Sequence, residues 1–380
     1  MIQLTRITST SLCRSRAKRR YNDGMITDLR LQHFRSFSDD SFELSPGVNI
    51  IVGPNASGKT NLLESILVLA RGVSYRARDS ELIQFSRPWA RIDGHSDKSA
   101  QRTVKLVAEP AQSKTYEIDG KSFKRLSPNN SLPVVLFEPE HLRLFSGGPE
   151  RRREYLDDLL EQTTAGYGTT RRQYKRALAQ RNRLLKQSSH VPQTELFPWN
   201  VRLSQLAGVI ARARGELAGQ INGKITGLYK ELSQTRTKVN LNYANRWPID
   251  TYESQLLKKL ETSQADDHLR GFTGSGPHRE DLLITFNGHP SQETASRGEV
   301  RTAVLALKII ELQIIETANN GRSPLLLLDD VFSELDGRRR HALTDYLAPY
   351  QTFITTTDAD IVLRHFSAHS NVIPLSVARG

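Results

Sequence analysis

The spacing of hydrophobic residues changes along the chain, and each spacing predicts a different kind of element. Loose alternation of apolar and polar residues predicts strands over 25–34 and 41–44. A short, mainly apolar and β-branched run, 47–52, predicts a buried strand. Apolar residues then recur at helical spacing, namely Leu62, Leu63, Ile66, Leu67 and Ala70. We expect a strand–loop–helix unit, with the two earlier strands flanking its strand.

Between residues 89 and 123 the pattern becomes a series of short strands. They are expected at 90–92, 103–107, 116–118 and 121–123. Asp119-Gly120 is a typical hairpin turn between the last two. We interpret this region as a small antiparallel lobe, after which a strand at 132–137 returns towards the main sheet.

Residues 149–270 are predicted to be helical. The longest signal, a helix opening near Pro198, is spaced by threes and fours: Leu203, Leu206, Ile210, Ala213, Leu217, Ile221, Ile225, Leu228 and Leu232. Another helix should begin at Pro149, and one around Leu256 and Leu260 should pack against the long helix. We interpret the apolar stripes as the helix–helix core of an arm.

After Gly271 the pattern of strands and helices returns. Strands are expected at 282–286, 325–328 and 352–356, and helices at 296–316 and 334–348. The chain therefore resolves into a basic leader at 1–24, the first part of a split α/β domain at 25–148, the arm at 149–270, and the second part at 271–380.

The loop after the run at 47–52 carries the first candidate chemistry. It has the pattern G-x-x-x-x-G-K-[ST]: Gly53, Pro54, Asn55, Ala56, Ser57, Gly58, Lys59 and Thr60, followed by Asn61. Between a strand and a helix, this pattern predicts a phosphate site built from backbone N–H groups and a helix N-terminus. Lys59 should reach the β- and γ-phosphates of ATP, and the Thr60 hydroxyl should bind Mg²⁺.

Two carboxylates follow the apolar strand at 325–328. The carboxyl end of a buried strand is where an α/β sheet presents its ligands. Asp329 is expected to hold the Mg²⁺ shell, and Asp330 to orient or deprotonate the attacking water. Together with the phosphate loop, this pair predicts an ATPase.

A serine-led helix and a short loop narrow the class further. Ser296 and Gly298 lie at the start of the helix expected at 296–316, and Ser333–Asp336 follows the two carboxylates. This order resembles the ABC-type ATPases, in which the signature helix of one subunit caps the γ-phosphate held by the other. The resemblance implies that Ser296, Gly298 and Asp336 contact nucleotide across an ATP-dependent homodimer. The fold class is then α/β: an ABC-type P-loop ATPase head with a small antiparallel β lobe and an inserted α-helical arm.

Several longer motifs resemble the RecF family of DNA-repair ATPases over residues 25 to about 375. They are His33–Phe37, Phe137–Glu140, Gly147–Pro149 with Arg151–Arg153, Gly276–Arg279, Ser296–Glu299 and Leu328–Asp336. The resemblance implies a protein that binds ATP, dimerises, and binds single- and double-stranded DNA at gaps or junctions. It also implies action with RecR and RecO to load RecA, and support of the SOS response.

Departures from the ABC pattern predict slow hydrolysis. Asp330 stands where a catalytic glutamate is usual, and Thr357 where most ABC ATPases carry a histidine that senses the γ-phosphate. A threonine can hydrogen-bond but cannot carry a charge. The glutamine of the ABC Q-loop has no clear counterpart, so Glu138 or Glu140 is expected to take its role.

The net charge of +12 indicates a polyanionic partner. Basic residues are expected on the outer faces of the arm, where they either contact DNA or are merely solvated: Arg151–Arg153, Arg171, Arg172, Lys175, Arg176, Arg181, Arg183 and Lys186. The absence of an aromatic platform or zinc-ligand spacing predicts backbone contacts with weak sequence preference.

The remaining composition excludes other classes. The single cysteine, Cys13, and the lack of a long apolar run predict a cytoplasmic protein without a membrane span. We expect residues 1–24 to be disordered or untranslated, with Met25 as the working start; the alternative is a short basic arm that touches DNA.

In the LSGGQ signature of the ABC-type ATPases, Ala295, Arg297 and Glu299 replace Leu, Gly and Gln here. This altered signature and the basic arm disfavour a transporter ATPase subunit. The arm is too short for an SMC-type chromosome-structural ATPase.

Overall fold

The computed structural model describes residues 25–96, 100–187, 192–366 and 370–376. By their internal contacts these residues form two compact units. Unit 1 comprises the chain up to Leu126, Arg322–Leu328 and the chain from Thr344, and unit 2 comprises Ser127–Gly321 and Asp329–Leu343. This grouping differs from the expected boundaries, because the helix expected at 296–316 packs on helices of the arm. The leader at 1–24 lies outside the described residues.

Unit 1 contains a parallel sheet whose strands run in the order β14-β3-β13-β12. Their bounds are β3 (Val48–Val52), β12 (Leu325–Leu328), β13 (Thr352–Thr356) and β14 (Ser370–Pro374). All residues of β12 and β13 are buried, and the uninterrupted apolar sequence of β12 predicts this for that strand. Helix α1 (Lys59–Arg71) follows β3 and the loop behind it.

The antiparallel lobe of unit 1 is larger than the sequence predicts. Its six strands run in the order β2-β1-β4-β5-β6-β7. They are β1 (Ile26–Phe34), β2 (Phe37–Glu43), β4 (Trp89–Ser96), β5 (Gln101–Val107), β6 (Ser113–Ile118) and β7 (Lys121–Phe123). The expectation that β1 and β2 flank β3 was wrong: β3 pairs with β13 and β14, while β1 pairs with β2 and β4. The alternating burial of β1 is typical of a sheet with one exposed face.

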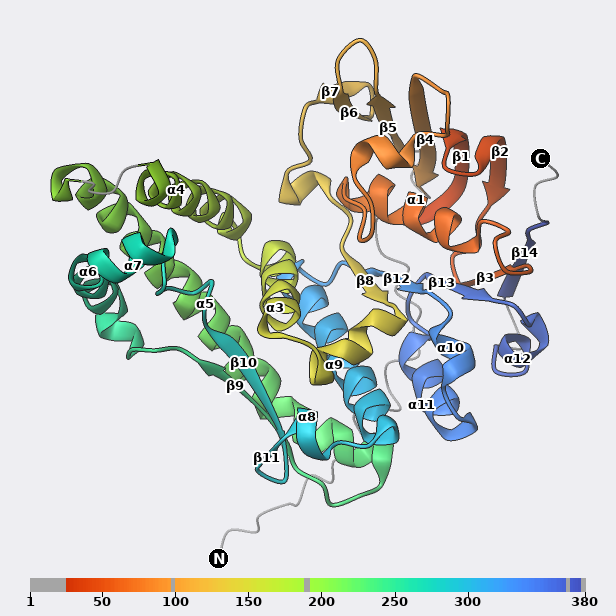
Figure 1. Ribbon diagram of the computed structural model, residues 1–380. Helices are drawn as coiled ribbons and strands as arrows, with labels where there is room; N and C mark the ends of the chain where they lie inside the picture. The colour runs from red at the N-terminus through yellow and green to blue at the C-terminus, as the bar shows by residue number, and fades with distance from the viewer. Residues whose placement is uncertain (1–24, 97–99, 188–191, 367–369, 377–380) are drawn as a thin grey trace, which may run out of the picture. The chain divides into compact units, whose positions relative to one another are not determined.

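Helices dominate unit 2 (Figure 1). After β8 (Val134–Phe137) come α2 (Arg143–Ser146), α3 (Pro149–Thr163), α4 (Tyr167–Gln187), α5 (Gln193–Ser233), α6 (Tyr252–Thr262) and α7 (Gln264–Arg270). As predicted, α6 packs against the long helix α5. Pro198 lies inside α5 rather than at its start. A proline so close to a helix N-terminus removes only one backbone bond there, and the helix continues through it.

The arm also contains a strand that the sequence analysis missed. Strand β9 (Val239–Ala244) pairs antiparallel with β10 (Asp281–Phe286), so residues 149–270 are not wholly helical. Its sequence alternates apolar and polar residues with the period of a strand, and the alternate positions are buried. Asn287 and Gly288, both with positive φ, form the turn to β11 (His289–Pro290).

The remaining helices follow β11 and the strands of the parallel sheet. They are α8 (Ser291–Thr294), α9 (Arg297–Ala318), α10 (Val331–Glu334), α11 (Gly337–Leu347) and α12 (Ala359–Leu363). Helix α9 packs on α3 and α5 within unit 2. Among the described residues, no helix is both long and apolar enough to cross a membrane.

Candidate nucleotide-binding site

The loop between β3 and α1 requires glycine for steric reasons at both glycine positions of the G-x-x-x-x-G-K-[ST] pattern. Gly58 has φ of 94°, in the left-handed region, and a Cβ there would lie 2.8 Å from the Ser36 hydroxyl oxygen. At Gly53 a Cβ would lie 2.4 Å from the carbonyl oxygen of Leu375. The loop therefore turns tightly against neighbouring segments of unit 1, in the conformation that the pattern predicts.

Backbone donors collect at the start of α1. The first intrahelical bond of the helix runs from the Leu62 amide to the Gly58 carbonyl, at 2.9 Å. The amides of Lys59 and Asn61 precede it, and backbone N–H groups in the first turn of a helix have no intrahelical acceptor. These N–H groups and the positive end of the helix dipole together favour an anion.

Two buried side chains of the loop have hydrogen-bonding capacity left for a phosphate. Lys59 is 5% exposed, and its ammonium donates to the carbonyl oxygens of Gly53 (2.8 Å) and Pro54 (3.0 Å). An ammonium has three protons, so one remains for an anion. The buried Ser57 hydroxyl has no hydrogen-bond partner among the described residues. This donor set fits a triphosphate.

A buried carboxylate fixes α1 to its surroundings. Glu64 is fully buried and accepts bonds from Arg35 (3.0 and 3.2 Å) and Arg76 (3.1 Å), and from Ser74. Burial alone would raise the pKa of Glu64, but these hydrogen bonds hold it below its usual value. Arg35, from the His33–Phe37 motif, thus binds the helix that follows the phosphate loop.

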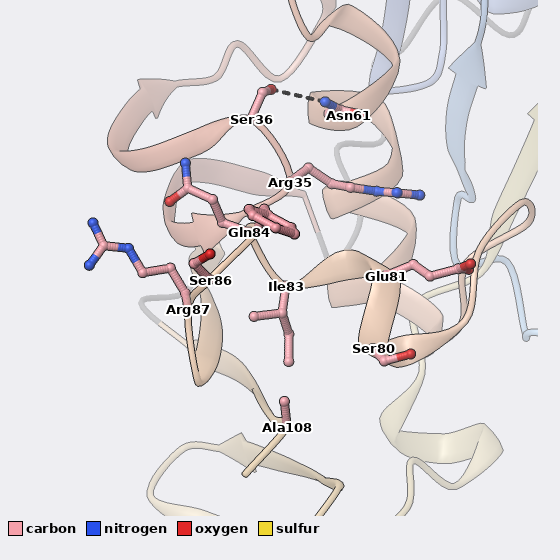
Figure 2. Close-up of a pocket in the computed structure, with 11 residues that line it drawn as sticks. Arg35, Ser36, Asn61, Ser80, Glu81, Ile83, Gln84, Ser86, Arg87 and Ala108 are labelled. Carbon is pink, nitrogen blue, oxygen red and sulfur yellow. Dashed lines mark hydrogen bonds between the residues drawn. The ribbon is translucent and has the colours of Figure 1, made fainter. Parts of the chain in front are cut away.

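An open pocket of about 530 Å³ lies beside the start of α1 (Figure 2). Asn61, directly after Thr60, lines it and donates to the Ser36 hydroxyl at 2.9 Å. Arg35 and Gln84 add polar groups, and Phe85, which is 95% exposed, adds an aromatic ring. The volume falls within the range of about 300–1,000 Å³ for small-molecule sites.

The parallel sheet brings several of the predicted residues to one edge. Strands β3, β13 and β12 are parallel neighbours, so their carboxyl ends lie together. The phosphate loop follows β3, and the exposed Thr357 follows β13; the Gly53 amide donates to the Thr356 carbonyl at 3.4 Å. Asp329 and Asp330 follow β12. Asp329 is 8% exposed, and its amide donates to Phe137.

The two glutamates considered for the Q-loop role differ in their surroundings. Glu140 is paired with Arg143 (3.0 Å) and Arg151 (2.7 Å). Burial raises the pKa of Glu138 to about 7, with a further contribution from the negative charge of Asp329. Glu138 is thus a carboxyl that changes its charge near neutral pH beside the predicted metal ligand.

The predicted signature serine caps α9. The Ser296 hydroxyl accepts from the Glu299 amide at 3.3 Å, and the Glu299 carboxylate accepts from the Ser296 amide at 2.9 Å. This reciprocal capping box assigns a local role to Glu299, which stands at the glutamine position of the ABC signature. Ser296 is exposed, and its hydroxyl proton remains available to donate.

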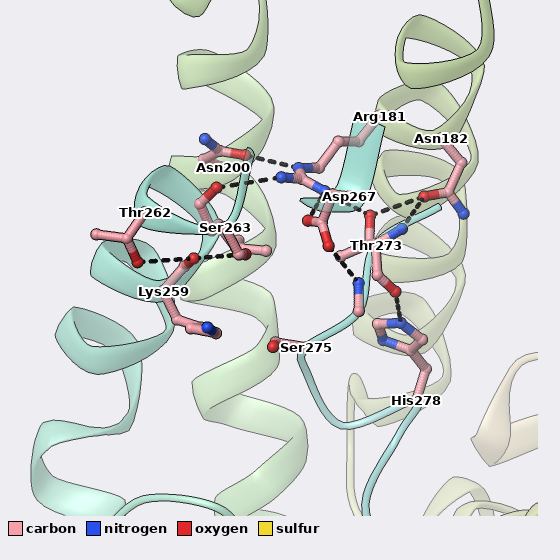
Figure 3. Close-up of polar contacts among 12 residues, drawn as sticks. Arg181, Asn182, Asn200, Lys259, Thr262, Ser263, Asp267, Thr273, Ser275 and His278 are labelled. Atoms are coloured by element: carbon pink, nitrogen blue, oxygen red, sulfur yellow. Dashed lines mark hydrogen bonds and ion pairs between the residues drawn. The ribbon is translucent and has the colours of Figure 1, made fainter. Parts of the chain in front are cut away.

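Several arginines expected on the outer faces of the arm are internal, so that expectation was wrong for them. Arg181 is fully buried and bonded to Asp267 (2.8 Å), Asn200 (2.7 Å) and Thr273 (2.8 Å), as Figure 3 shows. Arg171, on the same helix, is paired with Asp157, Asp158 and Glu161. A helical wheel contains the signal for Arg181, because it lies three to four residues from Leu178 and Leu185 on the apolar face.

Arginines of the motif Gly147–Pro149 with Arg151–Arg153 bind the residues that directly follow the Gly276–Arg279 (GPHR) motif. Arg152 forms a bidentate pair with Asp281 (2.7 and 2.8 Å), and Arg153 donates to the Glu280 carbonyl at 2.7 Å. Arg214, which the sequence analysis missed, is bonded to Asp157 and to the Pro277 carbonyl. Arg152, Arg153 and Arg214 therefore stabilise unit 2, because their guanidinium groups are hydrogen-bonded within it.

A cationic stripe remains exposed on α4. We use this name for Arg172, Lys175, Arg176, Arg183 and Lys186, all of which are exposed. At 100° per residue they lie within about 100° of one another around the helix axis. Helix α4 contains no acidic residue, and none of these cations forms an ion pair within the described chain.

Comparison with known proteins agrees with this geometry. The model described as "RecF/RecN/SMC N terminal domain" matches residues 25–373. The chain is 35% identical over 343 residues to the DNA replication and repair protein RecF of Heliobacterium modesticaldum, covering 87% of this chain and 92% of that protein. It is 34% identical over 348 residues to RecF of Enterococcus faecalis, with 88% and 92% covered.

Solved structures show the same relationship. A structure of the recombination mediator protein RecF-ATPrS in the RecFOR pathway superposes with a TM-score of 0.80 at 30% identity, covering 88% of this chain and 92% of that one. The corresponding RecF-ATP structure has a TM-score of 0.79, also at 30% identity. The head fold of an ABC-type ATPase, predicted from the motifs, is therefore confirmed. With matches that extend over most of its length in sequence and in structure, the chain belongs to the RecF family.

Proposed function

We propose that this protein is an ATP-dependent DNA-binding protein of DNA replication and repair. The observation that carries the proposal is the phosphate loop of unit 1, where Lys59 and Ser57 are buried with hydrogen-bonding capacity to spare. ATP fits this donor set, and the solved RecF-ATP relative supports the same ligand. The base and ribose would lie in the pocket beside Asn61.

Mg²⁺ would accompany the triphosphate. The Thr60 hydroxyl and the Asp329 carboxylate are the oxygen ligands proposed for it, and the ion would neutralise phosphate charge. Asp330 would orient the attacking water, and Thr357 would hydrogen-bond near the γ-phosphate. Asp330 has a shorter side chain than the usual glutamate, and Thr357 is uncharged, so hydrolysis would be slow and would act as a timer.

ATP would also join two copies of the chain. In the ABC-type ATPases that the motifs resemble, the signature helix of one subunit completes the nucleotide site of the other. Ser296 and Gly298 at the start of α9, with Asp336 before α11, would supply that surface here. The exposed, capped Ser296 supports this role, because its hydroxyl can still donate to a phosphate oxygen.

DNA is the proposed polyanionic partner, and the α4 cationic stripe its contact surface. From Arg172 to Lys186 the stripe extends about 21 Å at 1.5 Å per residue. Duplex DNA presents a phosphate charge about every 1.7 Å along its axis, so the stripe could contact several phosphates. Phosphate contacts specify no sequence, which agrees with weak sequence preference. By family membership, RecO and RecR are proposed as partners in loading RecA and supporting the SOS response.

Salt dependence tests the DNA proposal. We expect the triple variant Arg176→Gln, Arg183→Gln and Lys186→Gln to bind a duplex more weakly, because each lost phosphate contact removes counterion release. The slope of log K against log[salt], measured by fluorescence anisotropy with an ATP analogue, should become shallower by up to about 3.

A matched control uses exposed cations of the antiparallel lobe: Lys121→Gln, Lys124→Gln and Arg125→Gln. This variant removes the same charge and should retain the wild-type slope. Equal slopes for both triple variants would refute the stripe as the contact surface. A wild-type protein that bound no duplex under these conditions would refute DNA binding itself.

A further inference from the structure

One arginine connects the two elements that are proposed to reach the partner subunit. The Arg339 guanidinium, on α11, donates through Nε to the Thr302 hydroxyl (2.8 Å) and through Nη2 to the Gly298 carbonyl (3.1 Å), both on α9. Its Nη1 is paired with the Asp336 carboxylate. We refer to Ser333–Asp336 as the D-loop, after the corresponding loop of ABC-type ATPases. Arg339 thus contacts both the signature helix and the D-loop within one chain.

The backbone strengthens this connection on both sides. The Asp336 carboxylate accepts from the Arg339 amide at 2.9 Å, which caps α11. On α9, the Thr302 hydroxyl donates to the Gly298 carbonyl at 2.9 Å while it accepts from Arg339. The planar guanidinium has its donors in a fixed geometry, so three acceptors bound together restrict the D-loop relative to α9.

Ser296 and Asp336, the groups proposed to contact the partner, are more exposed than Arg339, which connects them. Ser296 and Asp336 are exposed, and the Asp336 side chain retains 56% of its accessible surface. The Arg339 side chain retains 21%, and Thr302 is fully buried. The arginine therefore lies behind the surface that carries the serine and the carboxylate.

We propose that Arg339 is a positioning residue that presents Ser296 and Asp336 to the partner subunit's nucleotide as one surface. The inference rests on the proposed ATP-dependent dimer. Arg339 also supplies a positive charge beside the Asp336 carboxylate. Without that charge, the carboxylate would approach a triphosphate uncompensated, and like charges repel. Loss of Arg339 therefore weakens dimerisation while the phosphate loop of the same chain continues to bind nucleotide.

Sedimentation of the full chain with a non-hydrolysable ATP analogue tests the inference. Arg339→Ala should raise the dimer dissociation constant about tenfold or more, as expected when a charge-assisted connection is lost. Nucleotide affinity of the dilute monomer and the melting temperature should stay near wild type. Arg339→Lys should restore the dimer only in part, since an ammonium cannot reproduce the planar contacts. Adding Asp336→Asn to Arg339→Ala should recover part of the loss by removing the uncompensated charge.

The outcomes separate the inference from the proposed function. A wild-type chain that stayed monomeric with the analogue would refute both. Wild-type dimerisation that Ser296→Ala abolishes and Arg339→Ala leaves intact would overturn the inference alone. Parallel losses of melting temperature, monomer nucleotide affinity and dimerisation in Arg339→Ala and Arg339→Lys would reduce Arg339 to a structural contact and also overturn it.

Discussion

At the scale of single residues, the GPHR motif shows how a histidine can serve the fold rather than chemistry. The Nδ1 atom of His278 is 2.7 Å from the Tyr174 hydroxyl, and Nε2 is 3.0 Å from the Thr273 carbonyl. A carbonyl can only accept, so the proton of the neutral ring lies on Nε2, and Tyr174 donates to Nδ1. Burial lowers the pKa of His278 to about 4.

This pKa predicts a loss of stability in acid. The unfolded chain binds a proton at His278 near pH 6.5, whereas the folded chain does so only near pH 4. The free energy of unfolding should therefore fall as the pH is lowered from 6.5 towards 4, by on the order of 3 kcal/mol from this group. Thermal unfolding of the full chain across that range measures the slope.

His278→Gln is the informative variant, because a glutamine amide can replace both hydrogen bonds and does not titrate. Its unfolding free energy should depend less on pH between 6.5 and 4 than that of the wild type. The exposed His289 on β11 provides the control, and His289→Gln should leave the slope unchanged. Identical slopes for His278→Gln and the wild type would contradict the assignment.

The sequence predicts local backbone structure well where a motif fixes it, and it predicts side-chain contacts poorly where charged groups are buried. Gly58 has the left-handed φ that the loop pattern requires, and Ser296 begins its helix as expected. Arg181 was placed on the surface because arginine is rarely buried without a partner. Its partner Asp267 lies far away in sequence, and no local pattern predicts that two distant charges meet.

At the scale of elements, the buried pair Arg181–Asp267 joins α4 to α7. Arg181 also donates to Asn200 on α5 and to the Leu260 carbonyl on α6, so several helices depend on one guanidinium (Figure 3). Asp267 in turn accepts from the Gly274 amide at 2.9 Å. The pair therefore joins helices that are distant from one another in the sequence.

Breaking this pair should destabilise unit 2 strongly. Asp267→Asn leaves a buried guanidinium without its counterion, and removal of one member of a buried pair costs about 3–5 kcal/mol. Chemical denaturation monitored by circular dichroism would measure the loss. Asp266→Asn, an exposed neighbour on the same helix, is the matched control and should change stability little. Equal unfolding free energies for the two variants would show that the pair contributes nothing.

The elements themselves were predictable to the extent that their patterns were long or repeated. Helix α5 and the apolar strand β12 follow directly from spacing. Strand pairing did not, because β1 lies close to β3 in sequence yet pairs with β4 in another sheet. Strand β9 was missed for a related reason: its alternation is short, and its partner β10 lies beyond two helices.

At the scale of the whole molecule, the phosphate loop belongs to unit 1, while Ser296 and Asp336 belong to unit 2. Within one chain, the loop proposed to bind nucleotide and the groups proposed to contact a partner's nucleotide therefore belong to different units. Family membership was predictable from the order of motifs along the chain. The grouping of α9 with the arm was not, because it depends on packing between segments distant in sequence.

The most direct test is sedimentation velocity of the full chain with Mg²⁺ and a non-hydrolysable ATP analogue. We expect the wild type to shift from monomer to dimer. Lys59→Ala should remain monomeric because it loses nucleotide, and Ser296→Ala should remain monomeric although it still binds the analogue. A wild type that binds the analogue and stays monomeric, or a Ser296→Ala variant that dimerises as the wild type does, would contradict the proposed sandwich.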